Sequence, residues 1–224
     1  MKIRVKHVKL GKLIFLSHLD MVLTVLRAIR RAEIPFSMTS GFSPKPKISY
    51  GLPLPVGAGS LSEYFDLKLK EYVPVSEIKE RLIREFPSSL RVENIWEIDE
   101  KKPSVQAQVS AAKYYLWLKQ REDSELHLED IFQGEKWLFV DRKGREKDLK
   151  SLIIDLEPLG VRQGLFGLKL FAQAGSRGNL RPGDFCEWLS QKSEGKIQLP
   201  GRILRTELYY GEPKKDFLTP FSGG

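Results

Sequence analysis

The first hundred residues switch repeatedly between strand and helix periodicity, and the order of these switches limits the folds that the chain can adopt. Apolar and charged residues alternate over residues 2–9, which is typical of a half-buried strand. From residue 18 to about 32 a helix is predicted, because apolar residues recur there at helical spacing: Leu19, Val22, Leu23, Leu26 and Ile29. Further patterns predict an extended, proline-rich sheet edge at 39–60, strands at 64–69 and 90–98, and a helix at 74–86. This β-α-β-β-α-β order is the ferredoxin-like plan.

The second half approximates the same order with one additional strand. Strands are predicted at 107–119, 137–140, 149–156, 165–172 and 203–210, and helices at 125–132 and 182–190. We therefore expect an α+β fold of two ferredoxin-like halves in tandem, each an antiparallel sheet with helices on one face. The polar, proline-bearing Lys101–Pro103 predicts a boundary between residues 1–102 and 103–214, and residues 215–224 are expected to be a loose tail.

The positive charge of the chain is concentrated near its start. The formal net charge is +8, and residues 1–60 contain ten Lys or Arg against only Asp20 and Glu33. The rest of the chain is neutral overall. Such a concentration attracts a polyanion more strongly than evenly spread charge, which favours a nucleic acid as ligand. The alternative is a solvated basic face without a ligand.

The chain has too few cysteines and histidines for a disulfide framework, an iron–sulfur cluster or a zinc site. The single cysteine, Cys186, excludes a disulfide framework, an iron–sulfur cluster built by this chain alone and a cysteine zinc site, and we expect it in the core. The histidines lack the spacing of metal ligands, and His7 and His127 have no suggestive neighbours in the sequence, so no metal site is predicted. No segment resembles a signal peptide or a membrane span, and a cytoplasmic protein is expected.

His18 is the only catalytic candidate, because it falls in the first turn of the first predicted helix. The helix dipole there favours a neutral imidazole, which could act as a general base or hold a phosphate. Ser17 and Asp20 form an S-x-x-D capping signal around it. The alternative is that His18 has only a capping or packing role.

Three arginines, Arg27, Arg30 and Arg31, follow at the other end of this helix. Guanidinium groups bind phosphates or carboxylates in a bidentate manner, so the three could form an anion clamp. The alternative is that Arg27 and Arg31 form structural ion pairs with Asp20, Glu63 or Asp66.

The loop that follows combines aromatic and basic residues. Its residues are Gly41, Phe42, Pro44, Lys45, Pro46 and Lys47, with Tyr50 close behind. An aromatic ring beside cations on a proline-stiffened loop suits a stacked base flanked by phosphates. The alternative is that Phe42 anchors the loop in the core and the lysines are solvated.

Two further groups are weaker candidates. Gly175–Gly178, followed by Arg181 at the start of a helix, could bind an anion through Arg177, Arg181 and backbone N–H groups, or could be a simple hairpin. Glu63 and Asp66 lie three apart on a predicted strand and point to opposite faces, which argues against a paired acid–base site.

Much of the chain resembles a bacterial family of unknown function, the radical-SAM-linked proteins. The resemblance rests on Lys12–Asp20, Arg27–Pro35, Gly41–Ser49, Leu52–Gly57 and Glu63–Asp66, and continues more weakly to Arg181–Pro182. It implies a radical-SAM protein as partner, with S-adenosylmethionine and the iron–sulfur cluster held by that partner and no cofactor held by this chain.

Three functions are compatible with these features. The leading hypothesis is an RNA-binding or substrate-presenting accessory protein, not itself an enzyme, that works with a radical-SAM enzyme in RNA or ribosome modification. The second is a metal-independent RNA endonuclease of the tandem ferredoxin-like type, with His18 assisting attack by a 2′-hydroxyl. The third is a protein–protein adaptor for the radical-SAM partner.

Overall fold

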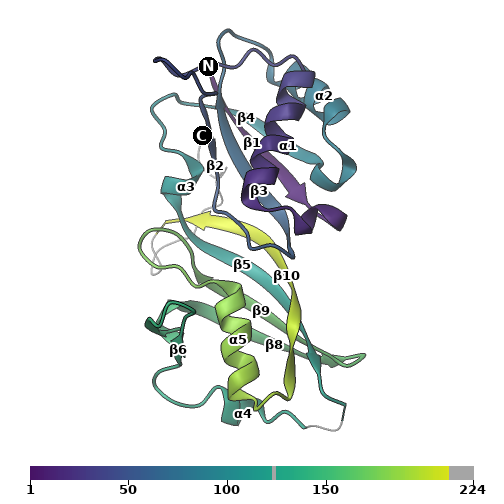
Figure 1. Cartoon of the computed structure of the whole chain (residues 1–224), viewed down its shortest axis with the longest axis vertical. Helices are drawn as coiled ribbons and strands as arrows, with labels where there is room; N and C mark the ends of the chain where they lie inside the picture. The colour runs from purple at the N-terminus through teal and green to yellow at the C-terminus, as the bar shows by residue number, and fades with distance from the viewer. Residues whose placement is uncertain (123–124, 212–224) are drawn as a thin grey trace. The chain divides into compact units, whose positions relative to one another are not determined.

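The computed structural model describes residues 1–122 and 125–211 and has a mixed α+β fold (Figure 1). The described chain divides into two compact units, the first formed by Met1–Val109 and the second beginning at Ser110. This division falls a few residues after the boundary predicted at Lys101–Pro103. The predicted loose tail, 215–224, lies outside the described residues.

In the first unit the strands and long helices follow the predicted β-α-β-β-α-β order. Their bounds are β1 Lys2–Lys9, α1 His18–Arg31, β2 Ile48–Tyr50, β3 Ala58–Lys68, α2 Val75–Glu85 and β4 Val92–Ile98, with the short helices η1 Gly11–Phe15, η2 Ser88–Leu90 and α3 Val105–Gln108. β1 lies between β4 and β3, β2 pairs with β3, and these pairings are antiparallel. The proline-rich segment thus contributes only a three-residue strand.

The core of the first unit lies between its sheet and its two long helices. Ile3 and Val5 of β1 are fully buried, and they pack with buried residues of both helices in one hydrophobic cluster. The bounds of α1 agree with the predicted helix, but its buried residues are Met21, Val25, Ala28 and Ile29, whereas Leu19 and Leu23, which were expected on the apolar face, are exposed. Both helices therefore cover the same face of the sheet, as Figure 1 shows.

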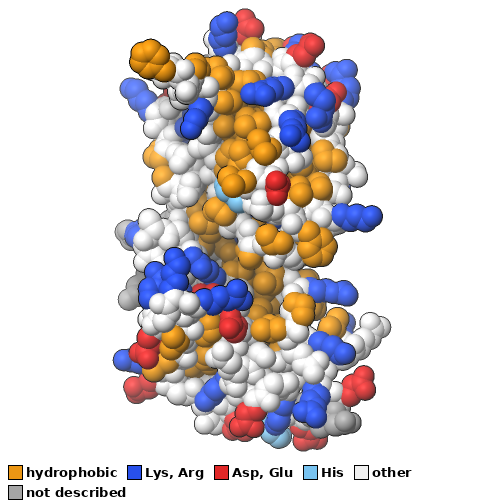
Figure 2. All heavy atoms as spheres, in the orientation of Figure 1, with side chains coloured by type: hydrophobic (Ala, Val, Ile, Leu, Met, Phe, Trp, Pro, Cys, Tyr) orange, Lys and Arg blue, Asp and Glu red, His pale blue; other side chains and the backbone are white. Residues whose placement is uncertain are grey.

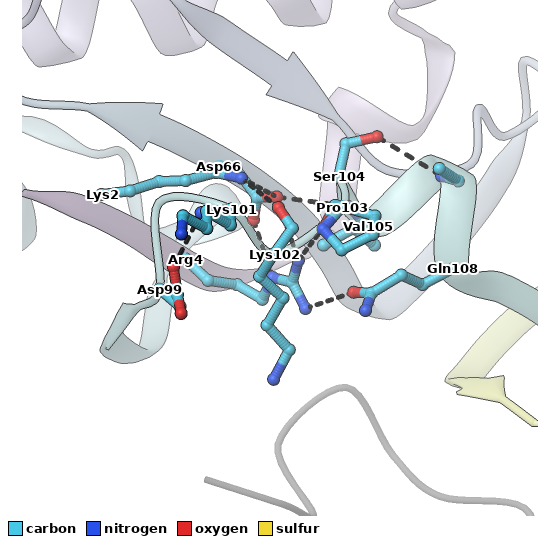
Figure 3. Close-up of polar contacts among 11 residues, drawn as sticks. Lys2, Arg4, Asp66, Asp99, Lys101, Lys102, Pro103, Ser104, Val105 and Gln108 are labelled. Atoms are coloured by element: carbon cyan, nitrogen blue, oxygen red, sulfur yellow. Dashed lines mark hydrogen bonds and ion pairs between the residues drawn. The ribbon is translucent and has the colours of Figure 1, made fainter.

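Because side chains alternate along a strand, Arg4 points away from the face that Ile3 and Val5 share. Arg4 is fully buried, and its Nε and Nη2 donate to the Oδ1 and Oδ2 of Asp66 at 2.7 and 3.0 Å (Figure 3). It also donates to Gln108 Oε1 at 3.1 Å and to the Pro103 carbonyl at 3.3 Å, while the Val105 amide donates to Asp66 Oδ2 at 3.2 Å. This network explains why residues 103–109 belong to the first unit.

The second unit has a strand order related to that of the first unit, but the connection between its first two sheet strands, β5 and β8, differs. Its elements are β5 Val109–Gln120, α4 Leu128–Ile131, β6 Leu138–Val140, β7 Glu146–Asp148, η3 Lys150–Leu152, β8 Ile153–Arg162, β9 Leu165–Gln173, α5 Pro182–Lys192 and β10 Ile197–Tyr210. The strands lie in the order β10-β5-β9-β8, and β6 and β7 form a separate antiparallel hairpin. The helix predicted at 125–132 is only a four-residue turn, and β7 was not predicted.

The sequence pattern also predicted the turn between β8 and β9 at the wrong position. Pro158–Gly160 was predicted to separate these strands, but β8 continues through it with a register shift. The chain instead reverses at Gln163 and Gly164, whose φ values of 52° and 71° are those of a tight hairpin turn. Proline and glycine thus mark a bulge here, and the turn itself lies closer to β9.

Cys186 belongs to the core of the second unit. It is buried in α5, and burial raises the pKa of its thiol to about 12, so the group stays protonated at neutral pH. Next to it, Trp188 stacks on Trp137 with ring centroids 4.8 Å apart. Within residues 1–122 and 125–211, no helix combines the length and apolar character that crossing a membrane requires.

The Arg4–Asp66 pair is expected to contribute strongly to the stability of the first unit. Asp66→Asn leaves the buried guanidinium without its counter-charge and should lower the free energy of unfolding by about 3–5 kcal/mol in urea denaturation. Arg31→Met, which removes the exposed partner of Glu85, is the matched control and should cost less than about 1 kcal/mol. Equal losses in the two variants would contradict this assignment.

Candidate nucleic-acid interface and polar pocket

The start of α1 is organised by its cap. The Ser17 Oγ accepts a hydrogen bond from the Asp20 amide at 3.2 Å and donates to Asp20 Oδ2 at 2.7 Å. The predicted capping signal is therefore present, and Asp20 bonds to Ser17 and not to an arginine. His18 is the first residue of the helix and its side chain is exposed.

At the other end of α1, the three arginines have different environments. Arg31 donates from Nε to Glu85 Oε2 and from Nη2 to the Glu85 carbonyl, both at 2.8 Å. Arg27 and Arg30 are exposed, and their side chains make no hydrogen bond or ion pair within the described chain. Figure 2 shows Lys and Arg side chains gathered around this end of α1.

Neither Arg27 nor Arg31 forms an ion pair with Asp20, Glu63 or Asp66, the partners that the sequence suggested. Asp66 pairs with Arg4, Glu63 lies in a pocket described below, and Arg31 pairs with Glu85 of α2. The physical reason is that α1 packs against α2, which brings Glu85 within reach of Arg31. The predicted clamp is thus reduced to Arg27 and Arg30.

The predicted binding loop is a short hairpin, residues 37–47. The Lys47 amide donates to the Ser37 carbonyl and the Thr39 amide to the Lys45 carbonyl, both at 2.8 Å. Gly41, with φ of 115°, turns the chain at the tip, and the Phe42 side chain there is completely exposed. The idea that Phe42 anchors the loop in the core is therefore wrong.

The cations and prolines of this hairpin lie on its return strand. Lys45 and Lys47 are exposed, and within the described residues their side chains have no hydrogen-bond or ion-pair partner. Pro44 is exposed, whereas Pro46 is partly buried and forms an isolated antiparallel β-bridge with Met38. The hairpin therefore presents an aromatic ring and two cations on a backbone that is already ordered.

A small pocket lies beside the start of α1, entirely within the first unit. It has a volume of about 20 Å³, enough for about one water molecule. The polar residues that line it include His7, Lys9, His18, Tyr50 and Glu63, and residues 51–54 line it as well. Strands β1 and β3 bring His7 opposite Glu63. The pocket thus joins residues that are far apart in the sequence.

Lys9 and His7 are both 2% exposed, although they are polar residues on a basic strand. Lys9 Nζ donates to the Leu16 carbonyl at 3.1 Å, and His7 Nδ1 lies 2.9 Å from the Val8 carbonyl. The pairing of β1 shifts register toward both neighbouring strands here, between His7 and Lys9 toward β3 and between Lys6 and His7 toward β4. Such bulges re-aim side chains and are frequent next to functional sites.

The sequence reasoning missed His7 and Lys9. His7 has no suggestive neighbours in the sequence, but in the structure it lines the pocket together with Glu63 and His18. A possible signal was the register of β1 and β3, which places His7 opposite Glu63. Alternation alone does not give that register.

Tyr50 belongs to the pocket wall and not to the exposed hairpin. Its ring lies edge-on to His18, with centroids 6.0 Å apart, and its hydroxyl donates to the Val22 carbonyl at 3.4 Å. Burial raises the pKa of Tyr50. Stacking on a base, as predicted for Tyr50, would require its ring to leave this position.

The weaker candidates, Arg177 and Arg181, lie in the second unit. Arg177 Nη2 donates to the Gly211 carbonyl at 3.1 Å, and Arg181 is the exposed residue that precedes α5. They therefore belong to a different unit from Arg27, Arg30 and the 37–47 hairpin. No group of three side chains suited to a metal ion occurs among the residues that the structure describes.

The structure is thus that of an α+β protein whose first unit has exposed cations, an exposed aromatic side chain and a small polar pocket. The chain belongs to a family described as uncharacterized proteins conserved in bacteria (DUF2344), whose model matches residues 2–182. No curated protein matches the sequence.

Among solved structures, the chain resembles one from the crystal structure of a Cbf5-Nop10-Gar1 complex. The TM-score is 0.54 at 11% identity, and the match covers 92% of this chain and 48% of that one. This protein thus spans about half the length of its structural neighbour, and the likeness describes the fold alone. A weaker match, with a TM-score of 0.23 and 12% identity, is to the encapsulated DyP-type peroxidase from Mycobacterium smegmatis, over 87% of this chain and 84% of that one.

The exposure of Phe42 leads to a prediction about stability. Phe42→Ser should change the free energy of unfolding by less than about 0.5 kcal/mol, because the Phe42 ring is fully exposed and does not pack against the hydrophobic core. Phe65→Ala, which empties a fully buried site on β3, should cost about 3–5 kcal/mol. Urea denaturation of both variants tests this, and a large loss for Phe42→Ser would show that the ring packs in solution.

Proposed function

We propose that this protein is a nucleic-acid-binding accessory protein, with RNA as its ligand, that works with a radical-SAM enzyme. The observation that carries the proposal is the exposure of Arg27 and Arg30 on α1 and of Phe42, Lys45 and Lys47 on the 37–47 hairpin, all in the first unit. Cations without an internal partner can neutralise phosphates, and an exposed ring can stack on an unpaired base.

This surface is smaller than the charge count of the sequence implies. Arg4 is neutralised by Asp66, Arg31 by Glu85, and the Lys9 ammonium is buried against a carbonyl. The remaining cations therefore carry the attraction for a polyanion. A single strand with splayed bases suits them better than a duplex, because a lone exposed ring needs an unstacked base.

The radical-SAM partner is supported by the sequence resemblance described above. One cysteine cannot hold an iron–sulfur cluster, so any such cluster and its S-adenosylmethionine would belong to the partner. The strand orders β4-β1-β3-β2 and β10-β5-β9-β8 support a tandem ferredoxin-like interpretation of the two units. A radical-SAM enzyme would then act on RNA that this chain presents.

Binding to a single-stranded RNA, followed by fluorescence anisotropy from about 50 to 200 mM salt, tests the proposal. Arg27→Glu with Arg30→Glu should weaken binding about tenfold or more and reduce the slope of log K against log salt by roughly 1.4, the value for two phosphate contacts. Lys101→Glu with Lys119→Glu makes the same charge change at exposed lysines elsewhere and is the matched control.

Absence of binding at low salt, or binding that does not respond to salt, would overturn the proposal. Equal weakening in both double variants would show that net charge matters and not this surface. Co-purification of the radical-SAM protein, without RNA binding, would instead support the adaptor function.

A second candidate function is RNA cleavage at the polar pocket. The observation that favours it is the burial of Lys9 in a pocket that His7, His18 and Glu63 also line, because buried ionisable groups in a pocket are typical of catalytic sites. His18 would accept the proton of a 2′-hydroxyl as this oxygen attacks phosphorus, and a water molecule would give a proton to the 5′-oxygen as its bond to phosphorus breaks. The products would be a 2′,3′-cyclic phosphate and a 5′-hydroxyl.

His18→Ala should then lower the rate of cleavage of a labelled RNA by about 10²–10⁴-fold, the usual contribution of a general base. The folded state should be kept, because His18 is exposed and the Ser17 cap remains. Gel analysis of the products measures this. No cleavage by the wild-type protein, or equal cleavage by both, would rule out this function.

A further inference from the structure

The turn that connects β6 to β7 in the second unit is held by one carboxylate. Asp141 Oδ1 accepts hydrogen bonds from the amides of Lys143 and Arg145 at 2.9 and 3.1 Å. Its backbone closes the turn as well, because the Asp141 amide donates to the Arg145 carbonyl at 2.9 Å. Gly144 takes the positive φ of 75° that the turn requires. The loop from Asp141 to Arg145 therefore has one defined conformation.

Ion pairs attach this hairpin to α5. Arg145 donates from Nε and Nη2 to Asp141 Oδ2 at 3.0 and 2.7 Å, and these bonds lower the pKa of Asp141 well below its usual range. Lys147 Nζ lies 3.2 Å from Asp141 Oδ2 and 3.1 Å from Asp184 Oδ2, and Asp184 belongs to the first turn of α5. The position of the turn is thus fixed relative to the second unit.

Two cations at the tip of the turn are not used in this network. Arg142 and Lys143 are exposed, and in the part of the chain that the structure describes their side chains have no hydrogen bond or ion pair. The acidic residues of the hairpin are Asp141, which is already paired, and Glu146 and Asp148 on the stem. Figure 2 shows Lys and Arg side chains gathered on the side of the second unit where β6 lies.

We propose that the tip of the β6–β7 hairpin, Arg142 and Lys143, binds the phosphates of the same single-stranded RNA that the first unit binds. The inference rests on the proposed function and adds a second contact site to it. Because Asp141 orders the turn before binding, little conformational entropy is lost when a phosphate docks.

The full-length chain with Arg142→Gln and Lys143→Gln tests the inference, using the same RNA and salt series. Binding should weaken about fivefold to tenfold, and the salt slope should fall by roughly 1.4. Lys119→Gln with Arg202→Gln removes two exposed charges from other strands of the same unit and should change affinity less than about twofold. All four side chains are exposed, and circular dichroism verifies that both variants fold.

The outcomes separate this inference from the proposed function. Wild-type binding that Arg27→Glu with Arg30→Glu weakens, but the hairpin variant leaves unchanged, overturns the hairpin contact and keeps the proposed function. Equal weakening by the hairpin variant and its control also overturns the contact, because charge alone then explains the effect. No binding by the wild-type protein overturns both.

Discussion

The buried ion pair between Arg4 and Asp66 determines much of the first unit. Removing two charges from water is costly, and their mutual attraction offsets this cost only when further hydrogen bonds complete the geometry. Here Pro103, Val105 and Gln108 supply those bonds. The pair therefore requires β1, β3 and the segment after β4 to be in place together, and it makes one basic residue of the N-terminal region part of the interior.

Not every basic residue of the N-terminal region is available to a ligand, because some of them are already paired inside the fold. Helical periodicity located α1 but not its buried face, because Leu19 and Leu23 were expected inward and are exposed, while Met21, Val25, Ala28 and Ile29 are buried. The pairing of Arg31 with Glu85 depends on how α1 packs against α2. Tertiary packing thus decided both which face of the helix is covered and which of its arginines is already neutralised.

The same division holds for the fold and for the pocket. Strands and helices of the first unit were predictable because each buries one regular face, and the Ser17 cap is local in sequence. The four-residue α4 and the hairpin after it lack such a repeating face, so their pattern was ambiguous. The pocket depends on strand register, which places His7 opposite Glu63, and alternation does not specify register.

The hairpin of residues 37–47 is closed by backbone hydrogen bonds, and the side chain at its tip, Phe42, contacts no core residue. The identity of the tip residue is therefore nearly independent of the stability of the fold. Related chains could exchange this aromatic residue for another and so alter ligand preference without any compensating change in the interior. The hairpin is a place where specificity can diverge while the scaffold is kept.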